Sequence, residues 1–319
     1  MGWLLLGCWV TDAEVAGWKG EGRVADNAVD SSTGGATHPP IDTATALHAP
    51  GEWRMTRNVG TMRWIPAGVF AMGSDEGEPG HQSDEIQHSV RLTHGYWMMV
   101  HEVKQAEWKV VTARHGYSTA IQELAYNDSC GGSCPVEDVS WCDAVVFANL
   151  VSYDEGLDPV YLLPSESALG SSDCDSMSSQ VTVDSTANGY RLPTEAEWER
   201  AARGGADFKY AGSDVVDDVA WFLGNSSATS HAVCAKNLNG YQLCDMSGNV
   251  SEWVWDWYDD EYPNPAVPDS MGPENGVGRV SRGGSWSQYA SWTRVASRDY
   301  WNPAYRTNII GFRLVRLDP

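Results

Sequence analysis

The sequence has few basic residues, and this shortage excludes a class of partners. Its 319 residues include 21 Lys and Arg against 43 Asp and Glu, which gives a formal net charge of −22. Because binding to a phosphate backbone needs an excess of positive charge, we expect no nucleic-acid partner. Such acidity is typical of a protein kept in solution at a surface or outside the cell.

Several motifs are also missing. Beyond the N-terminus, no apolar run reaches the roughly 20 residues that a membrane-spanning helix needs. The sequence contains neither a Gly-x-Ser-x-Gly nucleophile turn nor a Gly-Lys-Ser/Thr phosphate loop. Residues 245–319 contain no cysteine, so this stretch offers no thiolate to a nucleophilic or metal-dependent reaction.

The N-terminal residues carry a different signal. Residues 1–8, MGWLLLGC, look like a truncated lipoprotein signal with a lipobox, in which Cys8 would receive the lipid anchor. The alternative is an ordinary apolar N-terminus, because no Lys or Arg precedes the short apolar run. Residues 9–59 are rich in small and polar residues and predict a flexible spacer, so we expect the folded domain over residues 60–319.

Six further cysteines predict disulfides and an oxidising compartment; they are Cys130, Cys134, Cys142, Cys174, Cys234 and Cys244. We favour the pairs Cys130–Cys134 and Cys234–Cys244 because each would close a short loop. A zinc site that includes Cys130 and Cys134 is the alternative, although no second Cys or His pair follows at a finger-like distance.

The 32 glycines and 16 tryptophans favour an irregular, loop-rich α+β fold, in which large aromatic side chains fill the gaps between short elements. Apolar spacing and capping residues predict three helices, over Glu102–Ala113, after Ser140 and after Thr194. Strand patterns predict a hairpin over Arg63–Ser74 and strands at 279–281, 312–314 and Trp253–Trp257, the last in the core rather than in a sugar-binding surface. Residues 156–188 are expected to form a surface insertion.

Six motifs occur in a fixed order, and together they are similar to one family. They are Met72-Gly73-Ser74, Pro135-Val136 with Val139-Ser140-Trp141, Arg191–Glu199 (RLPTEAEWE), Asp245–Trp253 (DMSGNVSEW), Arg282–Trp286 (RGGSW) and Gly311-Phe312-Arg313. This set resembles the formylglycine-generating enzyme, or sulfatase-modifying factor, domain family. The resemblance implies a fold related to C-type lectins.

The resemblance also implies an activity, and the sequence departs from it. Active members oxidise a substrate cysteine with O2 and copper held by two cysteines. The positions that match those cysteines are Ala290 and Val295, and neither side chain can ligate Cu(I). We therefore expect no copper and no catalytic residue of this kind.

A second set of residues recurs along the C-terminal stretch, namely Arg282–Trp286, Arg294–Ala296, Arg298, Asn302-Pro303, Arg306 and Ile310–Val315. This set resembles the variable proteins of diversity-generating retroelements, which use a lectin-like fold for display. The mixture of aromatic and short polar residues in this stretch suits a contact surface over residues 286–308. The candidate ligand-binding residues are Trp286, Gln288, Tyr289, Ser291, Trp292, Asp299, Tyr300, Trp301 and Tyr305.

One metal site is implied by the same resemblance. Asp245, Gly248, Val250 and Glu252 match a structural calcium site of the enzymes, and their oxygen atoms suit a hard cation. The alternative is that Asp245 caps a turn and Glu252 pairs with an arginine.

Two functions therefore stay open. The first is a non-catalytic protein of the bacterial cell envelope, secreted or lipid-anchored, that binds a protein or glycan. The second is an active formylglycine-generating oxidoreductase acting on a sulfatase cysteine. A structural module of an envelope complex is a third and less specific possibility.

Overall fold

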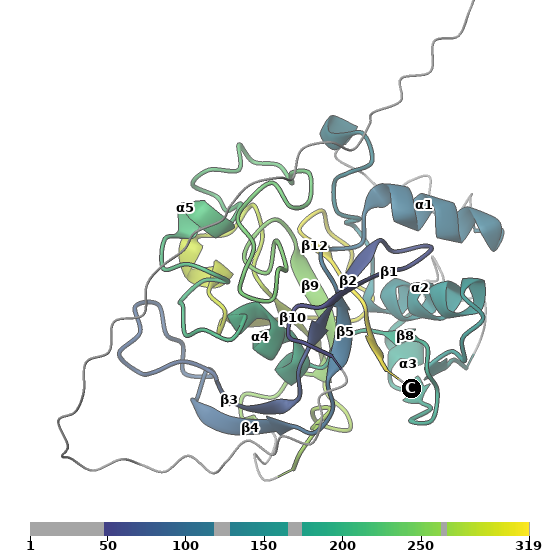
Figure 1. Cartoon of the computed structure of the whole chain (residues 1–319), viewed down its shortest axis with the longest axis horizontal. Coiled ribbons are helices and arrows are strands. Elements are labelled where there is room, and N and C mark those ends of the chain that lie inside the picture. Colours follow the sequence, from purple (N-terminus) through teal and green to yellow (C-terminus); the bar gives the residue numbers. More distant parts are fainter. Residues whose placement is uncertain (1–47, 118–127, 165–173, 263–266, 319) are drawn as a thin grey trace, which may run out of the picture. The chain divides into compact units, whose positions relative to one another are not determined.

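The computed structural model describes residues 48–117, 128–164, 174–262 and 267–318. All of these residues belong to one compact unit with short helices, several small sheets and long loops, which confirms the loop-rich α+β class (Figure 1). The predicted lipobox with Cys8, and the spacer as far as residue 47, lie outside the described residues.

A five-stranded antiparallel sheet runs through this unit in the order β1-β2-β5-β13-β8. Its strands are β1 (Trp53–Met55), β2 (Thr61–Ile65), β5 (Tyr96–Met99), β13 (Val315–Leu317) and β8 (Tyr190–Arg191). Because β1 pairs with β2, the sheet begins before the predicted domain start at residue 60.

A four-stranded sheet carries most of the C-terminal motifs in the order β11-β10-β9-β12. Its strands are β9 (Ser251–Trp257), β10 (Arg279–Arg282), β11 (Arg298–Trp301) and β12 (Ile310–Gly311). The predicted strand at 312–314 is wrong. There the chain crosses from β12 to β13, and the carbonyls of Phe312 and Leu314 accept hydrogen bonds from Val103 and Met99.

The predicted hairpin over Arg63–Ser74 is also wrong. Its two halves form strands, but β3 (Gly68–Met72) pairs with β4 (His88–Leu92), while β2 pairs with β1 and β5. The Arg200 side chain donates hydrogen bonds to the Pro66 and Ala67 carbonyls. The polar groups of the turn between the two strands are therefore paired by a helix that lies far away in the sequence.

The three predicted helices are present as α1 (Gln105–Arg114), α2 (Trp141–Asp154) and α4 (Glu195–Arg203). Ser140 and Thr194 each close a capping box with the residue three positions on. Shorter elements are η1 (Asp128–Cys130), α3 (Cys174–Ser178), α5 (Val216–Val219), η2 (Ala290–Thr293) and the strand pair β6 (Tyr161–Leu162) with β7 (Thr182–Val183). Within the described ranges, no helix has the length and apolar content needed to cross a membrane.

Two hydrophobic clusters lie on opposite faces of these sheets. Successive side chains of a strand point to opposite faces, and on β9 Trp253 joins the cluster around α2 while Val254 joins the cluster around α4. In Figure 1, α1 and α2 flank the strands on one side, and α4 with β3 and β4 lies on the other. Trp253 and Trp257 are buried, as expected for core residues rather than a sugar-stacking surface.

Three disulfides join the six cysteines of the described part. Cys130–Cys134 and Cys234–Cys244 confirm the favoured pairs and contradict a zinc site at Cys130 and Cys134; the third bond is Cys142–Cys174. This third bond ties α2 to the stretch predicted as a surface insertion. That interpretation of 156–188 is wrong in part, because Tyr161, Met177 and Val181 are buried in the core.

Candidate functional site

A double-glycine turn brings a loop back over the four-stranded sheet. Gly283 and Gly284 follow β10 with φ angles of 88° and 66°, which glycine adopts without strain. A Cβ atom on Gly284 would lie 2.5 Å from the Trp292 carbonyl oxygen. The turn therefore needs glycine both for its backbone angles and for the close approach of the returning chain.

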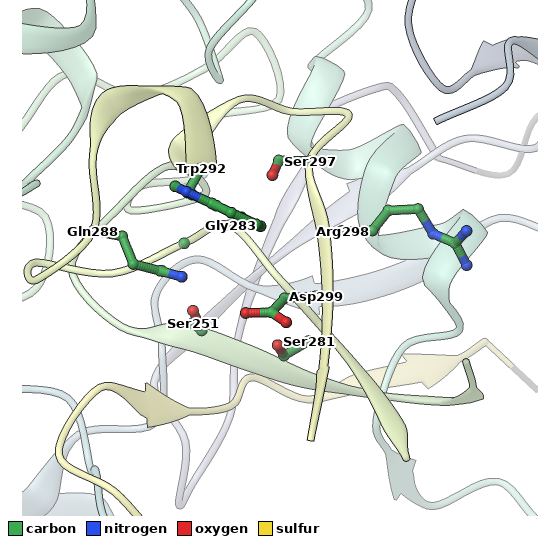
Figure 2. A pocket seen from close by; sticks show the side chains of 9 residues that line it. Ser251, Ser281, Gly283, Gln288, Trp292, Ser297, Arg298 and Asp299 are labelled. Atoms are coloured by element: carbon green, nitrogen blue, oxygen red, sulfur yellow. The ribbon is translucent and has the colours of Figure 1, made fainter. Parts of the chain in front are cut away.

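The returning loop covers a small pocket of about 170 Å³ between η2 and the sheet (Figure 2). Its lining residues are Ser251, Ser281, Gly283, Gly284, Gln288, Trp292, Ser297, Arg298 and Asp299. This volume is an upper bound because it includes space open to solvent. Most of this volume is open to solvent, and the enclosed part has room for about one water-sized group.

The floor of the pocket comes from one face of three neighbouring strands. Ser281 of β10 and Asp299 of β11 are direct cross-strand partners, which places their side chains side by side on the same face. Ser251 extends the floor from β9. Ser281 is 1% exposed, and its Oγ atom has no hydrogen-bond partner among the described residues.

Asp299 carries the charge of the pocket. One of its carboxylate oxygens accepts a hydrogen bond of 2.8 Å from the Tyr300 backbone N–H. Burial raises the pKa of Asp299, and the neighbouring charge of Asp84 adds to this effect. No ion pair joins Asp299 to a cationic side chain in the parts of the chain that the structure describes.

The wall and rim come from the loop after the glycine turn. Trp292 and Gln288 are half-buried, and the Oε1 atom of Gln288 accepts a hydrogen bond of 3.2 Å from the Ser285 hydroxyl. Arg298 also borders the pocket, but its guanidinium points away from it in Figure 2. There it binds the Glu195 carboxylate through two hydrogen bonds of 2.6 and 2.9 Å.

The predicted ligand-binding residues do not form one continuous patch. Gln288, Trp292 and Asp299 line the pocket, whereas Tyr300 points to the opposite face of β11 and stacks on Tyr258 at 4.2 Å.

The remaining predicted residues lie around this pocket. Trp301 stacks on the partly exposed Tyr305 at 4.8 Å, and Tyr289 is 69% exposed. Trp286 is held by a hydrogen bond from its Nε1 to the Asn308 carbonyl, and Ser291 is half-buried with its carbonyl bonded to Arg294.

Two floor residues were missed from the sequence, namely Ser251 and Ser281. A signal existed in the alternation of β9, where Ser251 shares a face with Trp253, Trp255 and Trp257. A small polar residue that continues a row of large aromatic ones leaves a gap on that face.

The two positions predicted to match the family's copper-binding cysteines lie in the same loop. Ala290 begins η2 and is half-buried, and Val295 is 1% exposed within the core. All six cysteines in the described ranges are disulfide-bonded. In this part of the chain, no free thiol lies beside the pocket.

The residues of the predicted calcium site fit an ion only in part. Both carboxylate oxygens of Glu252 accept hydrogen bonds from the Arg313 guanidinium at 2.7–2.9 Å, and one also accepts from Trp198. Asp245 accepts the Cys234 N–H, while its Oδ1 is buried without a hydrogen-bond partner among the described residues. Calcium takes six to eight oxygen ligands, so with Glu252 committed to Arg313 the site stays a prediction.

The surroundings of Asp245 explain its electrostatics. Burial raises its pKa to about 6, and the charge of Glu252 adds to this effect. Burial also raises the pKa of Glu102, which accepts hydrogen bonds from Val250 and Asn249. Cys234 and Cys244 lie beside Asp245 with their potential ligand atoms within 4.8 Å of one another, but the two sulfurs are bonded to each other.

Comparison with known proteins gives consistent results. A model of the sulfatase-modifying factor enzyme 1-like domain matches residues 51–317. The chain is 35% identical over 178 residues to the chaperone protein LppX of Paenibacillus barcinonensis. The aligned residues are 49% of this chain and 60% of the chaperone, so the match spans less than two thirds of the chaperone's length.

Two further relatives match most of the chain. Identity to the formylglycine-generating enzyme of Mus musculus is 29% over 285 residues, which are 78% of this chain and 73% of the enzyme. The solved structure of Treponema denticola variable protein 1 superimposes with a TM-score of 0.71 at 31% identity, covering 83% of this chain and 99% of that one.

Proposed function

Because the chain belongs to the sulfatase-modifying factor enzyme 1-like domain family, we propose that it uses the family's fold to bind a protein or glycan ligand. The contact surface is the loop and strand region 286–308, with the Trp292 pocket as its recessed part. The chain does not oxidise a substrate cysteine in this proposal.

One observation carries the proposal: side chains without a thiol occupy both positions where the active enzymes hold copper. Val295 is packed in the core, and the side chain of Ala290 has no atom that could ligate a metal. Cu(I) needs soft thiolate or thioether ligands. The six disulfide-bonded cysteines of the described part offer no substitute.

The surface chemistry supports binding. Tyr289 and Tyr305 expose large rings in this region, and tyrosine gives contact area at a low cost in side-chain entropy. The similarity to a protein whose name is variable protein 1 agrees with a display role for this face.

A location outside the cytoplasm accompanies the proposal. Disulfides persist mainly in oxidising compartments, and three of them join residues of this domain. In this proposal the protein is secreted or is anchored to a membrane through lipidated Cys8, and the anchor is its only membrane contact.

The copper assay tests the negative half of the proposal. Purified protein is incubated with Cu(I) and a cysteine-containing sulfatase peptide, and the peptide mass and bound copper are measured. We expect an unchanged peptide and no stoichiometric copper. Conversion of the cysteine, or one tightly bound Cu(I) per chain, would overturn the proposal in favour of an active oxidoreductase.

A binding screen tests the positive half. The labelled protein is applied to arrays of extracellular proteins and glycans beside the double variant Tyr289→Ser/Tyr305→Ser. Both rings are partly or largely exposed, so the variant should fold normally while losing roughly tenfold or more in affinity. Equal binding by both proteins would exclude this surface as the contact.

A further inference from the structure

The Trp292 pocket has a chemistry that selects one kind of ligand group. Its floor offers the Asp299 carboxylate and the Ser251 and Ser281 hydroxyls, and Trp292 provides an aromatic wall (Figure 2). Ser281 Oγ is buried without a hydrogen-bond partner among the described residues, and a buried polar atom left unpaired costs free energy that a ligand can recover. A serine hydroxyl can donate or accept, whereas a carboxylate such as that of Asp299 only accepts. The carboxylate therefore makes the pocket favour a ligand that donates hydrogen bonds.

The charge of the pocket decides whether that ligand group is an anion or a cation. Among the lining residues, Arg298 is the one cation, and its guanidinium is bound to Glu195 on the opposite face of the strand. Asp299 has no such partner in the described ranges, and the nearby charge of Asp84 reinforces it. An anion would meet an unopposed carboxylate, whereas a cation would be attracted both by Asp299 and by a chain of net charge −22.

The shape of the pocket decides the kind of cation. The enclosed part of the pocket admits one water-sized group, and the rest of a ligand would have to extend into solvent. An ammonium is a compact charge with three donors, whereas a guanidinium is a wide planar fork. Trp292 can contact an ammonium through its ring face, and tryptophan is the best aromatic partner for a cation.

We propose that this pocket binds the ammonium group of a lysine side chain on a protein ligand, with Asp299 and the floor hydroxyls as acceptors and Trp292 as a cation–π wall. This inference rests on the binding role proposed above and names the group that is recognised. Amino sugars and free polyamines carry the same group, so the experiment includes both.

The test uses NMR titration of the full chain with Nα-acetyl-lysine methylamide as the probe. Matched probes are its Nε-acetylated form, which lacks the charge, and the corresponding arginine derivative. We expect saturable shifts of the Trp292 indole N–H with the lysine probe, and binding at least about tenfold weaker for the other two. Equal binding of the acetylated probe would overturn the proposal.

Variants assign the effect to the pocket. Asp299→Asn keeps the shape and removes the charge, and it should weaken binding by about tenfold or more. Asp207→Asn is the matched control, because Asp207 is a 94% exposed carboxylate in the loop after α4, and binding should be unchanged. Trp292→Leu should weaken binding severalfold, and thermal unfolding confirms that each variant is folded.

The remaining outcomes separate the possible ligand sources and the two proposals. Glucosamine or cadaverine binding more tightly than the lysine probe would overturn the assignment to a protein lysine. If array ligands bind through Tyr289 and Tyr305 but are insensitive to Asp299→Asn and to lysine acetylation, the ammonium inference fails and the binding role stands. Copper-dependent turnover would instead remove the binding role itself.

Discussion

The two faces of the four-stranded sheet are built from neighbouring residues and have opposite electrostatics. On the face toward α4, Glu252, Arg282 and Arg298 each bond to an oppositely charged side chain. On the face toward the loop that follows Gly283-Gly284, the same three strands carry Ser251, Ser281 and Asp299. In the described ranges Asp299 forms no ion pair. Neighbouring residues of one strand therefore lie on different faces. We call the face toward α4, where the charges are paired, the closed face.

The arginine side chains show how the fold holds the backbone of the proposed contact surface in place. Arg282 donates to the carbonyls of Val295, Ala296 and Ser297, and it also pairs with Glu199 of α4. Arg294 binds Glu85 through two hydrogen bonds and so ties the loop between β3 and β4 to η2. Arg282 and Arg294 therefore anchor the backbone on both sides of the loop that carries the proposed contact surface.

The largest expected effect comes from breaking the closed face at Arg282. The substitution Arg282→Met leaves Glu199 short of one partner inside the core and removes the hydrogen bonds to the loop carbonyls. Removal of one partner of a buried ion pair typically costs about 3–5 kcal/mol. Urea-induced unfolding should show this loss, and the remaining pair between Glu199 and Arg203 places it toward the lower value.

The adjacent residue provides the control for this experiment. Ser281→Ala changes the same strand on the other face and removes a hydroxyl without a hydrogen-bond partner in the described ranges. Removal of an unsatisfied polar atom is close to neutral or stabilising. If Ser281→Ala lowered the free energy of unfolding as much as Arg282→Met, the two faces would not differ in how their polar groups are paired.

A smaller effect concerns pH and Asp256, which also lies on the closed face. Burial raises its pKa to about 8, and the charge of Glu195 adds to the shift. Since an unfolded aspartate titrates near 4, the folded state keeps a proton that the unfolded state loses. The stabilisation from this proton is complete below pH 4 and is lost as the pH rises toward 8.

The substitution Asp256→Asn should remove this dependence. The stability of the variant relative to the parent should rise by about 3 kcal/mol between pH 5 and pH 7, which is two pH units at about 1.4 kcal/mol each. Glu102 and Asp245 also have raised pKa values but are present in both proteins, so they cancel in the difference. Parallel stability curves would mean that Asp256 is ionised in the folded protein.

Features that depend on neighbours in the sequence were predictable. The caps at Ser140 and Thr194 and the disulfides Cys130–Cys134 and Cys234–Cys244 each involve residues a short distance apart in the chain. The motif set predicted the family and the fold class. Three pocket residues, Gln288, Trp292 and Asp299, were predicted because they lie between the motif residues in one segment.

Features that depend on strand pairing were not predictable in the same way. The stretch 63–74 has the composition of a hairpin, but its strands find partners in β5 and β4, which nothing local specifies. Ser251 and Ser281 become pocket residues only when three separate strands are in register. The position of Tyr300 on the opposite face depends on that same register.

The smallest expected effect contrasts two tyrosines of the predicted surface. Tyr289→Ser should change the free energy of unfolding by less than about 0.5 kcal/mol, since the ring is 69% exposed and the Trp292 N–H bonds to its backbone carbonyl. Tyr300→Ser should cost about 0.5–1.5 kcal/mol more, because the ring stacks on Tyr258. Thermal unfolding of both variants measures the difference, and equal costs would show that the stacking on Tyr258 does not stabilise the folded chain.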